Sequence, residues 1–458
     1  MFINDALYKF QNSKLGLFLS NSFIFENIDN ISFILLILTI ISTTFMSSGF
    51  IGMFASLFAF SCFFKLLAKS GEEMHLTFIN KILMVYFLFV IISAMGASLF
   101  VLSLKGILKT FIYAIFYFAL CYFLSTNKKK IKSIFLTIAG VISFESIIAI
   151  MQNLSHVEEI ATWQDASALS DPTKAISRAY GTLKPYNPNL LAGYLVSGIS
   201  SLFGLSLISY FENNKKRTII YTILFLTAFF AIFVTGSRGA YLGLFGFLFV
   251  IVLYAIYFIK KYCGGFKNLQ KRYKIMISSF IAFCAGIVLC IPSFLQRIIS
   301  IFSFRGDSSI SFRMNVYQAC YQMFLDNKIL GIGVGNKNFR EIYGLYMMTG
   351  YDALGSYCVP LEIAVESGIF ALLSFVAYIG LVIYKSVKYV LSENNILENR
   401  IIVFSILLAT VAVMFHGLFD TIFFRPQVQI IFWTNIAIFH SLINPISKKD
   451  KVVLIGHN

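Results

Sequence analysis

Uninterrupted apolar blocks of about 17 to 22 residues recur along this chain from residue 31 to residue 443. An α-helix rises about 1.5 Å per residue, so one such block matches the roughly 30 Å of hydrocarbon in a bilayer. The helices of a soluble core do not need such blocks, because they bury only one face. The sequence therefore predicts an all-α polytopic membrane protein.

The composition agrees with this fold class. The chain is 58% hydrophobic and 13% charged, whereas soluble domains carry about 25% charged residues. Its net charge of +16 would suit a nucleic-acid-binding protein, but the basic residues lie in short clusters between apolar blocks. We therefore expect the lipid bilayer and no nucleic acid as a partner. The sequence indicates no cofactor or metal site, and it names no protein partner.

About twelve transmembrane helices are expected. They are 31–47, 50–68, 82–97, 106–124, 132–152, 189–210, 219–236, 239–259, 275–291, 363–387, 401–419 and 428–443. A cytoplasmic N-terminus places every dense lysine cluster, including 128–130, 215–217 and 448–449, on the cytoplasmic side. This satisfies the positive-inside rule. We therefore expect both termini in the cytoplasm and a multi-pass protein of the cytoplasmic (inner) membrane.

The spans divide the chain into a transmembrane domain with a short segment at each end. These parts are residues 1–30 (cytoplasmic or interfacial), 31–443 (transmembrane domain) and 444–458 (cytoplasmic tail). Two long loops, about 153–188 and 292–360, fall on the outer side in this orientation. Their length and polarity predict that they fold over the membrane face.

The second outer loop contains a predicted helix. Residues 311–325 have the spacing of an amphipathic helix, with Met314, Cys320 and Tyr321 among the apolar positions. Cys320 and Cys358 fall in the same loop, which permits a disulfide between them.

Arginine and lysine separate across this topology. Seven of the ten arginines lie outside, whereas most lysines lie inside. Arginine differs from lysine in its planar fork, which holds phosphate or carboxylate through two parallel hydrogen bonds. We expect some outer arginines to pair with loop carboxylates and the rest to face an anionic ligand. The candidates for anion binding are Arg178, Arg238, Arg305, Arg313 and Arg425.

Arg238 is the sharpest of these candidates. It lies in residues 235–240 (TGSRGA), between two apolar spans. A charge so close to hydrocarbon usually faces a cavity or a partner, and the flanking glycines permit a close approach of a ligand or helix. The alternative is an arginine that only extends its charge to the interface.

Acidic and histidine side chains gather at the outer ends of two other spans. His416, Asp420 and Arg425 lie within ten residues, where they could handle a proton or bind an anion. The alternative is an Asp420–Arg425 ion pair beside a packed histidine. Glu362 and Glu366 are one helical turn apart, so we expect them to share one face and to pair with outer arginines.

Three further features carry expectations. Asn187 is expected to cap the sixth span, with Asn189 near the same face. Glu145 lies within the fifth span and needs a partner there. Residues 331–336 (GIGVGN) mimic a dinucleotide-binding loop but lack its strand-helix frame, so we interpret them as a flexible turn.

Together these motifs resemble the O-antigen ligase and polymerase superfamily over roughly residues 30–443. Residues 235–240 look like its central motif, and 331–336, 366–368 and 416–420 follow in the family's order. A closer resemblance is to a cyanobacterial branch of bicarbonate (inorganic carbon) transporters. The segments shared with that branch are 161–163, 186–192, 305–309 and 356–362.

For the superfamily, the resemblance implies transfer of a glycan from a polyprenyl-diphosphate carrier to an acceptor at the outer face. Arginines grip the diphosphate, here matched by Arg238 and Arg313, and a base activates the acceptor hydroxyl. The ligases' catalytic histidine stands eleven residues before a glycine, and the same count from Gly368 reaches Tyr357. A phenol with a pKa near 10 is a poor base. The candidates for the catalytic role are therefore His416, Asp420 and Tyr357.

Two functions follow from the two resemblances. The transporter branch implies a membrane protein that binds bicarbonate at its arginine-lined outer face, which fits the missing histidine. The wider superfamily implies a ligase or polymerase that acts on a polyprenyl-diphosphate-linked glycan. We take bicarbonate transport as the first hypothesis and glycan transfer as its alternative, and the sequence leaves open whether the chain is an enzyme.

Overall fold

The computed structural model describes residues 9–13, 22–68, 77–155, 178–265 and 308–444, with a few positions between 268 and 286. Regular secondary structure in these residues is helical throughout. Ten of the described helices are long and apolar enough to cross a membrane. The prediction of an all-α polytopic membrane protein is confirmed. The orientation, the cytoplasmic termini and the outer position of the loops stay predictions.

Each of these ten helices overlaps a predicted span. They are α4 (Ile28–Phe45), α5 (Ser48–Ala68), α6 (Phe78–Met95), α7 (Phe100–Thr126), α8 (Ile131–Leu154), α10 (Pro188–Phe211), α11 (Lys215–Val234), α12 (Arg238–Cys263), α17 (Val359–Leu391) and α18 (Leu397–Gly417). The shorter elements are α3 (Phe23–Glu26), η1 (Lys128–Lys130), α15 (Ser308–Asp326), α16 (Asn336–Tyr343) and η5 (Ile422–Phe424).

The two remaining predicted spans have different outcomes. The span at 428–443 forms α19 (Pro426–Ile443), a helix buried on almost every side that carries polar residues such as Gln429, Asn435 and His440. It is therefore less apolar than the ten and packs inside the bundle. The span at 275–291 lies mostly outside the described residues.

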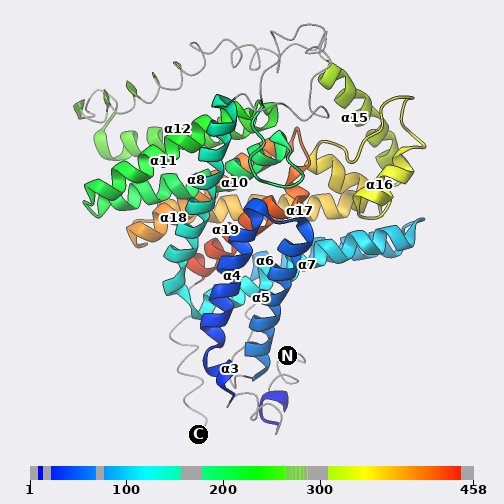
Figure 1. Cartoon of the computed structure of the whole chain (residues 1–458), viewed down its shortest axis with the longest axis horizontal. Helices are drawn as coiled ribbons and strands as arrows, with labels where there is room; N and C mark the ends of the chain where they lie inside the picture. Colours follow the sequence, from blue (N-terminus) through cyan, green and yellow to red (C-terminus); the bar gives the residue numbers. More distant parts are fainter. Residues whose placement is uncertain are drawn as a thin grey trace.

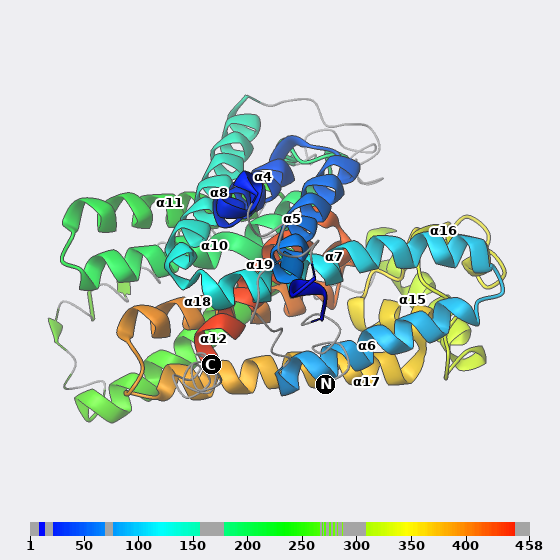
Figure 2. The same ribbon diagram turned by 90° about the horizontal axis from the view of Figure 1, so that it is seen from below.

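The bundle is built around α10, α18 and α19. Most residues of these helices are buried, whereas α12 exposes large side chains such as Phe245 and Phe249. The exposed apolar faces of the outer helices suit contact with lipid tails. α15 and α16 lie at one end of the molecule, with α16 beside α7, and α11 and α12 extend to the opposite end (Figures 1 and 2).

α17 is broken near its start. Gly368 has φ of +79°, a backbone conformation that residues with a side chain rarely adopt. A Cβ at Gly368 would also overlap the carbonyl of Ile329. The break takes backbone groups out of the helical ladder, and such groups need new partners when they are buried.

The segment 328–335 supplies those partners. The amide of Ile369 donates to the carbonyl of Lys328 at 2.9 Å, and the amide of Ile332 donates to the carbonyl of Val365 at 2.9 Å. The carbonyl of Glu366 accepts from the amide of Gly333 at 3.0 Å and from the hydroxyl of Ser93 at 2.6 Å. The segment is thus a wedge between the break in α17 and the start of α7.

The interpretation of 331–336 as a flexible turn is wrong. A Cβ at Gly106 on α7 would lie 2.9 Å from the Cα of Gly335 and would overlap the carbonyl of Val334. The amide of Val334 also donates to the hydroxyl of Ser103 at 2.9 Å. The glycines let this backbone lie directly against α7 and against the break in α17.

The predicted amphipathic helix is confirmed as α15, but part of its predicted face is wrong. Val316, Cys320 and Met323 are buried in a small second core with residues of α16 and α17. Met314 and Tyr321 are exposed, because only one narrow stripe of the helix meets these partners. Cys320 and Cys358 are both free thiols, so the disulfide that the sequence permits is not formed.

We predict that Gly368→Ala lowers the stability of the protein by at least about 2 kcal/mol, because it adds left-handed backbone strain to an overlap with Ile329. Gly380→Ala is the matched control in the same helix, since no atom lies within 4 Å of a Cβ there. The melting temperature of the detergent-purified protein measures both. Equal melting temperatures for the two variants would contradict the role given to the break.

Candidate functional site

Arg313 on α15 lies where three segments meet. Its Nη1 donates to the carbonyl of Phe419 at 2.6 Å, and its Nη2 lies 3.8 Å from Oδ2 of Asp420. Its guanidinium carbon lies 5.5 Å from the centre of the Tyr357 ring, a geometry in which the cation is attracted to the ring face. The guanidinium is therefore held in one place by a carbonyl, a carboxylate and an aromatic ring.

Tyr357 occupies a constrained position in this cluster. Its φ is +53°, which is uncommon for a residue with a side chain. Its carbonyl accepts from the hydroxyl of Tyr317 at 3.3 Å. Burial raises the pKa of the Tyr357 phenol above its usual value, and the nearby Asp420 adds to this while Arg313 opposes it. A raised pKa leaves even less phenolate, so Tyr357 is unsuited to act as a base.

Asp420 follows α18 and is only 7% exposed. Burial raises the pKa of its carboxyl, and the positive charge of Arg313 partly opposes that rise. The alternative of an Asp420–Arg425 ion pair is wrong, because the ion pair of Asp420 is with Arg313 from a distant part of the chain. Arg425 is exposed and acts on Asp420 only through its charge. A carboxylate with a raised pKa is a better proton acceptor than an ordinary one.

Glu362 and Glu366 are both buried in the first turns of α17. The expectation that they pair with arginines is wrong, since each accepts from a backbone amide. Glu362 accepts from Ser356, and Oε1 of Glu366 accepts from Gly335 at 3.0 Å. The break in α17 explains this, because it brings the wedge segment within reach of Glu366.

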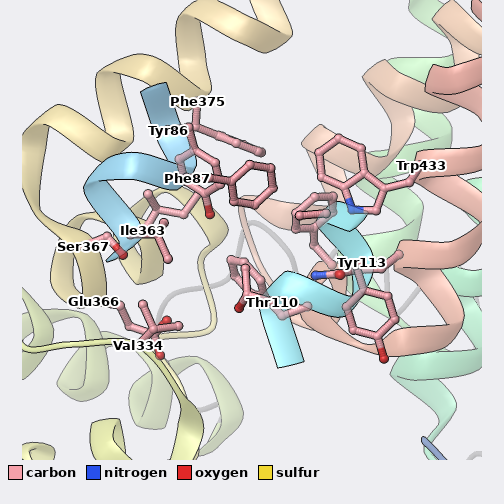
Figure 3. Close-up of a pocket in the computed structure, with 15 residues that line it drawn as sticks. Tyr86, Phe87, Thr110, Tyr113, Val334, Ile363, Glu366, Ser367, Phe375 and Trp433 are labelled. Atoms are coloured by element: carbon pink, nitrogen blue, oxygen red, sulfur yellow. The ribbon is translucent and has the colours of Figure 1, made fainter. Parts of the chain in front are cut away.

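Glu366 also lines a cavity of about 40 Å³ between α6, α7, α17 and α19. Much of the lining is aromatic, with Tyr86, Tyr113, Phe375 and Trp433 among its members. Figure 3 shows Glu366 and Val334 on one side of the cavity and Trp433 and Tyr113 on the other. The sequence analysis missed this cavity, whose only local signal is the recurrence of aromatic residues on α6 and α7.

Arg178 connects the start of α10 with the turn before α12. Its Nε donates to the carbonyl of Thr235, and its Nη2 donates to Oδ1 of Asn189, both at 2.9 Å. Asn187 caps α10 by accepting from the amide of Asn189 at 2.8 Å, which confirms the predicted cap. Arg178 therefore lies beside the segment that carries Arg238, and Asn189 holds it there.

His416 packs against the residue that follows Arg238. Its side chain is 1% exposed, and a Cβ at Gly239 would lie 2.8 Å from its Cδ2 and 3.0 Å from its Nε2. Gly239 directly follows Arg238, and His416 stands one helical turn before Asp420. Within the described residues, neither ring nitrogen has a hydrogen-bond partner. The imidazole is enclosed between helices, so a substrate hydroxyl cannot reach it in this arrangement.

The structure thus brings most of the predicted site residues together. Arg313 contacts both Tyr357 and Asp420. His416, four residues before Asp420, packs against Gly239, and Arg178 is bonded to Thr235 in the same turn before α12 that contains Arg238. Arg305 lies outside the described residues. Among the described side chains, no three of His, Cys, Asp or Glu meet as metal ligands.

Glu145 on α8 has the partner that its place within a span requires. Its Oε2 accepts from the amide of Thr182 at 3.0 Å, and its Oε1 is hydrogen-bonded to the hydroxyl of the same residue. This contact ties the segment that follows Arg178 to the bundle. The role of Glu145 is therefore structural.

Residues 223–376 match the O-antigen ligase family. Over 223 residues the chain is 28% identical to the teichuronic acid biosynthesis protein TuaE of Bacillus subtilis (strain 168), and the match covers 45% of this chain and 41% of that protein. The chain therefore spans about two fifths of the length of this curated relative. Both findings support the O-antigen ligase superfamily. The part that matches the O-antigen ligase family contains Arg238, Arg313 and Tyr357, whereas Asp420 follows it in sequence.

We predict that Asp420→Asn does not lower the melting temperature at neutral pH. The raised pKa means that the folded state binds the proton more tightly than the unfolded chain, whose ordinary pKa is about 3.9. The bound proton therefore stabilises the fold fully at a pH below the unfolded pKa. This stabilisation is lost as the pH rises through the higher pKa that Asp420 has in the folded protein. At pH 7 the charge therefore costs stability, and asparagine removes it.

At pH 7 the Asp420→Asn variant should melt at the same temperature as the unmodified protein or higher. Any such advantage should shrink as the pH is lowered toward the pKa of the Asp420 carboxyl. A variant that melts clearly lower at pH 7 would mean that the ion pair with Arg313 outweighs the burial of the carboxylate.

Proposed function

We propose that this protein moves a glycan from a polyprenyl-diphosphate carrier to an acceptor at the outer face of the cytoplasmic membrane, as a ligase or polymerase. The observation that carries the proposal is the contact between Arg313 and Asp420. A fixed guanidinium suits the departing diphosphate, and a buried carboxylate beside it suits the proton of the incoming hydroxyl.

In this proposal the acceptor hydroxyl attacks the anomeric carbon of the carried glycan. The new glycosidic bond forms as the bond between that carbon and the diphosphate oxygen breaks, and the diphosphate leaves with the electron pair. Asp420 takes the hydroxyl proton. Arg313 stabilises the charge that develops on the leaving diphosphate, which is the usual work of fixed cations in such transfers.

The other residues have supporting roles. Tyr357 stands where ligases have their histidine, and we propose that it positions Arg313 through its ring. Arg178 and Arg238 extend the cationic surface toward the start of α12, where the second phosphate or the carrier is expected to lie. Among the candidate bases, Asp420 is favoured over His416 because the imidazole is enclosed, and over Tyr357 because the pKa of its phenol is raised.

The similarity to TuaE supports an anionic polysaccharide such as teichuronic acid as the product class. Bicarbonate transport stays the alternative from the sequence resemblance, but nothing in the site favours it. The cavity between the spans contains the carboxylate of Glu366 and has no lysine or arginine in its lining. The cavity therefore offers a bicarbonate ion no cationic partner.

Deletion of the gene distinguishes glycan transfer from bicarbonate transport. We predict shorter or missing surface polysaccharide and unchanged bicarbonate-dependent carbon uptake, measured on the same cultures by gel analysis of the polysaccharide and by isotope uptake. Normal polysaccharide together with impaired uptake would refute glycan transfer and support the carrier.

We predict that Arg313→Lys reduces glycan transfer at least about tenfold, because lysine keeps the charge but cannot hold both phosphate and carbonyl in one plane. Arg238→Lys is expected to reduce it for the same reason. The assay follows elongation of a polyprenyl-diphosphate-linked glycan in membranes that carry equal amounts of each variant.

The matched control is Arg340→Lys. Arg340 on α16 forms an exposed ion pair with Asp352, so the conservative change there should leave transfer within about twofold. If lysine serves as well as arginine at both 313 and 238, the guanidinium clamp is not part of the mechanism.

A further inference from the structure

The first turns of α7 expose side chains of opposite character on one face. Val101, Leu104 and Leu108 are 63%, 42% and 59% exposed. Lys105 and Lys109 are exposed on the same face, one helical turn apart. Neither lysine has an ion-pair partner within the described part of the chain. Two unpaired like charges therefore stand side by side among exposed apolar residues.

Only the headgroup layer of a bilayer suits this mixture. In the hydrocarbon core the leucines would be favourably placed but the charged lysines would be costly to bury. In water the lysines would be solvated but the leucines would expose apolar surface. α7 has 27 residues, so it is about 40 Å long and exceeds the hydrocarbon core by about 10 Å. Its first turns can therefore reach the phosphates while the leucines remain among the upper parts of the acyl chains.

A third lysine lies beside this face. Gly106 of α7 packs against Gly335, and α16 begins one residue later with Lys337 exposed in its first turn. The start of α16 also carries the positive end of the helix dipole. Figures 1 and 2 both show α16 beside the first half of α7. These lysines lie on the predicted outer side, where lysine is otherwise scarce.

We propose that Lys105, Lys109 and Lys337 bind the phosphate of an anionic phospholipid, whose acyl chains lie along Leu104 and Leu108. Lysine suits a single phosphodiester, since it offers a point charge, whereas a diphosphate is better held by arginine forks.

The three lysines are also distinct from the proposed glycan-transfer site, since the described contacts of Arg313 are with Phe419, Asp420 and Tyr357. Thr110 and Tyr113 of α7 line the cavity with Glu366, and Tyr113 is buried there, whereas Lys105 and Lys109 are exposed. The bound lipid is therefore a constituent of the surrounding bilayer, and its binding does not depend on the proposed function.

The test uses the full chain and the double variant Lys105→Gln with Lys109→Gln. Native mass spectrometry counts the phosphatidylglycerol molecules retained from mixed micelles of phosphatidylglycerol and phosphatidylcholine. We expect apparent affinity for phosphatidylglycerol to fall about fivefold for each lysine removed, and to fall further with Lys337→Gln. The double change to arginine should retain binding. All changed side chains are exposed, so melting temperatures should stay the same.

The control is Lys215→Gln with Lys216→Gln, an exposed pair at the start of α11 that removes the same charge. It should leave the retained phosphatidylglycerol within about twofold. Equal losses in both double variants, or no loss in the first, would overturn the proposal. A parallel titration with undecaprenyl phosphate in place of phosphatidylglycerol should show weaker binding. Tighter binding of undecaprenyl phosphate that depends on Lys105 and Lys109 would overturn the assignment to a bilayer phospholipid.

Discussion

The hydrogen bonds between the break in α17 and the segment 328–335 hold the rest of the site in place. An apolar surrounding offers no water to the backbone groups that the break at Gly368 releases, so another part of the chain must satisfy them. The wedge segment does so from both sides of Glu366. It also fixes the distance between α17 and α7, and it connects α15 to α16. The position of Tyr357, just before α17, follows from that arrangement.

Electrostatics then decides what the predicted outer face can do. Arg313 receives a carbonyl, a carboxylate and an aromatic ring from two other segments, so its charge is placed before any ligand arrives. The acidic side chains of α17 are satisfied by backbone amides instead, so they do not compete with Asp420 for Arg313. Burial raises the pKa of the Asp420 carboxyl and of the Tyr357 phenol, and a higher phenol pKa makes Tyr357 the poorer base of the two. The cluster therefore combines one prepared cation with one prepared proton acceptor.

The spans were predictable because their signal is local: each apolar block alone is long enough to cross the bilayer. The cap at Asn187 and the need of Glu145 for a partner are local in the same sense. The partner of Asp420 was not predictable, because Arg313 is more than one hundred residues away and Arg425 is only five. The break at Gly368 was equally hidden, since its cause is the wedge segment rather than its neighbours. The exposed side of α15 depended on which helices it met, which periodicity cannot tell.

The Arg313–Asp420 contact gives the proposed reaction an order of events. The same guanidinium cannot hold the carboxylate and a diphosphate equally well, so an arriving carrier competes with Asp420 for it. Before the carrier arrives, the ion pair occupies the carboxylate and keeps it from accepting a proton. Once the carrier has taken over the arginine, the carboxylate is released beside the bond that is to break. In the proposed mechanism, binding of the diphosphate carrier thus frees Asp420 to act as the base. An acceptor hydroxyl that binds without the carrier is not deprotonated.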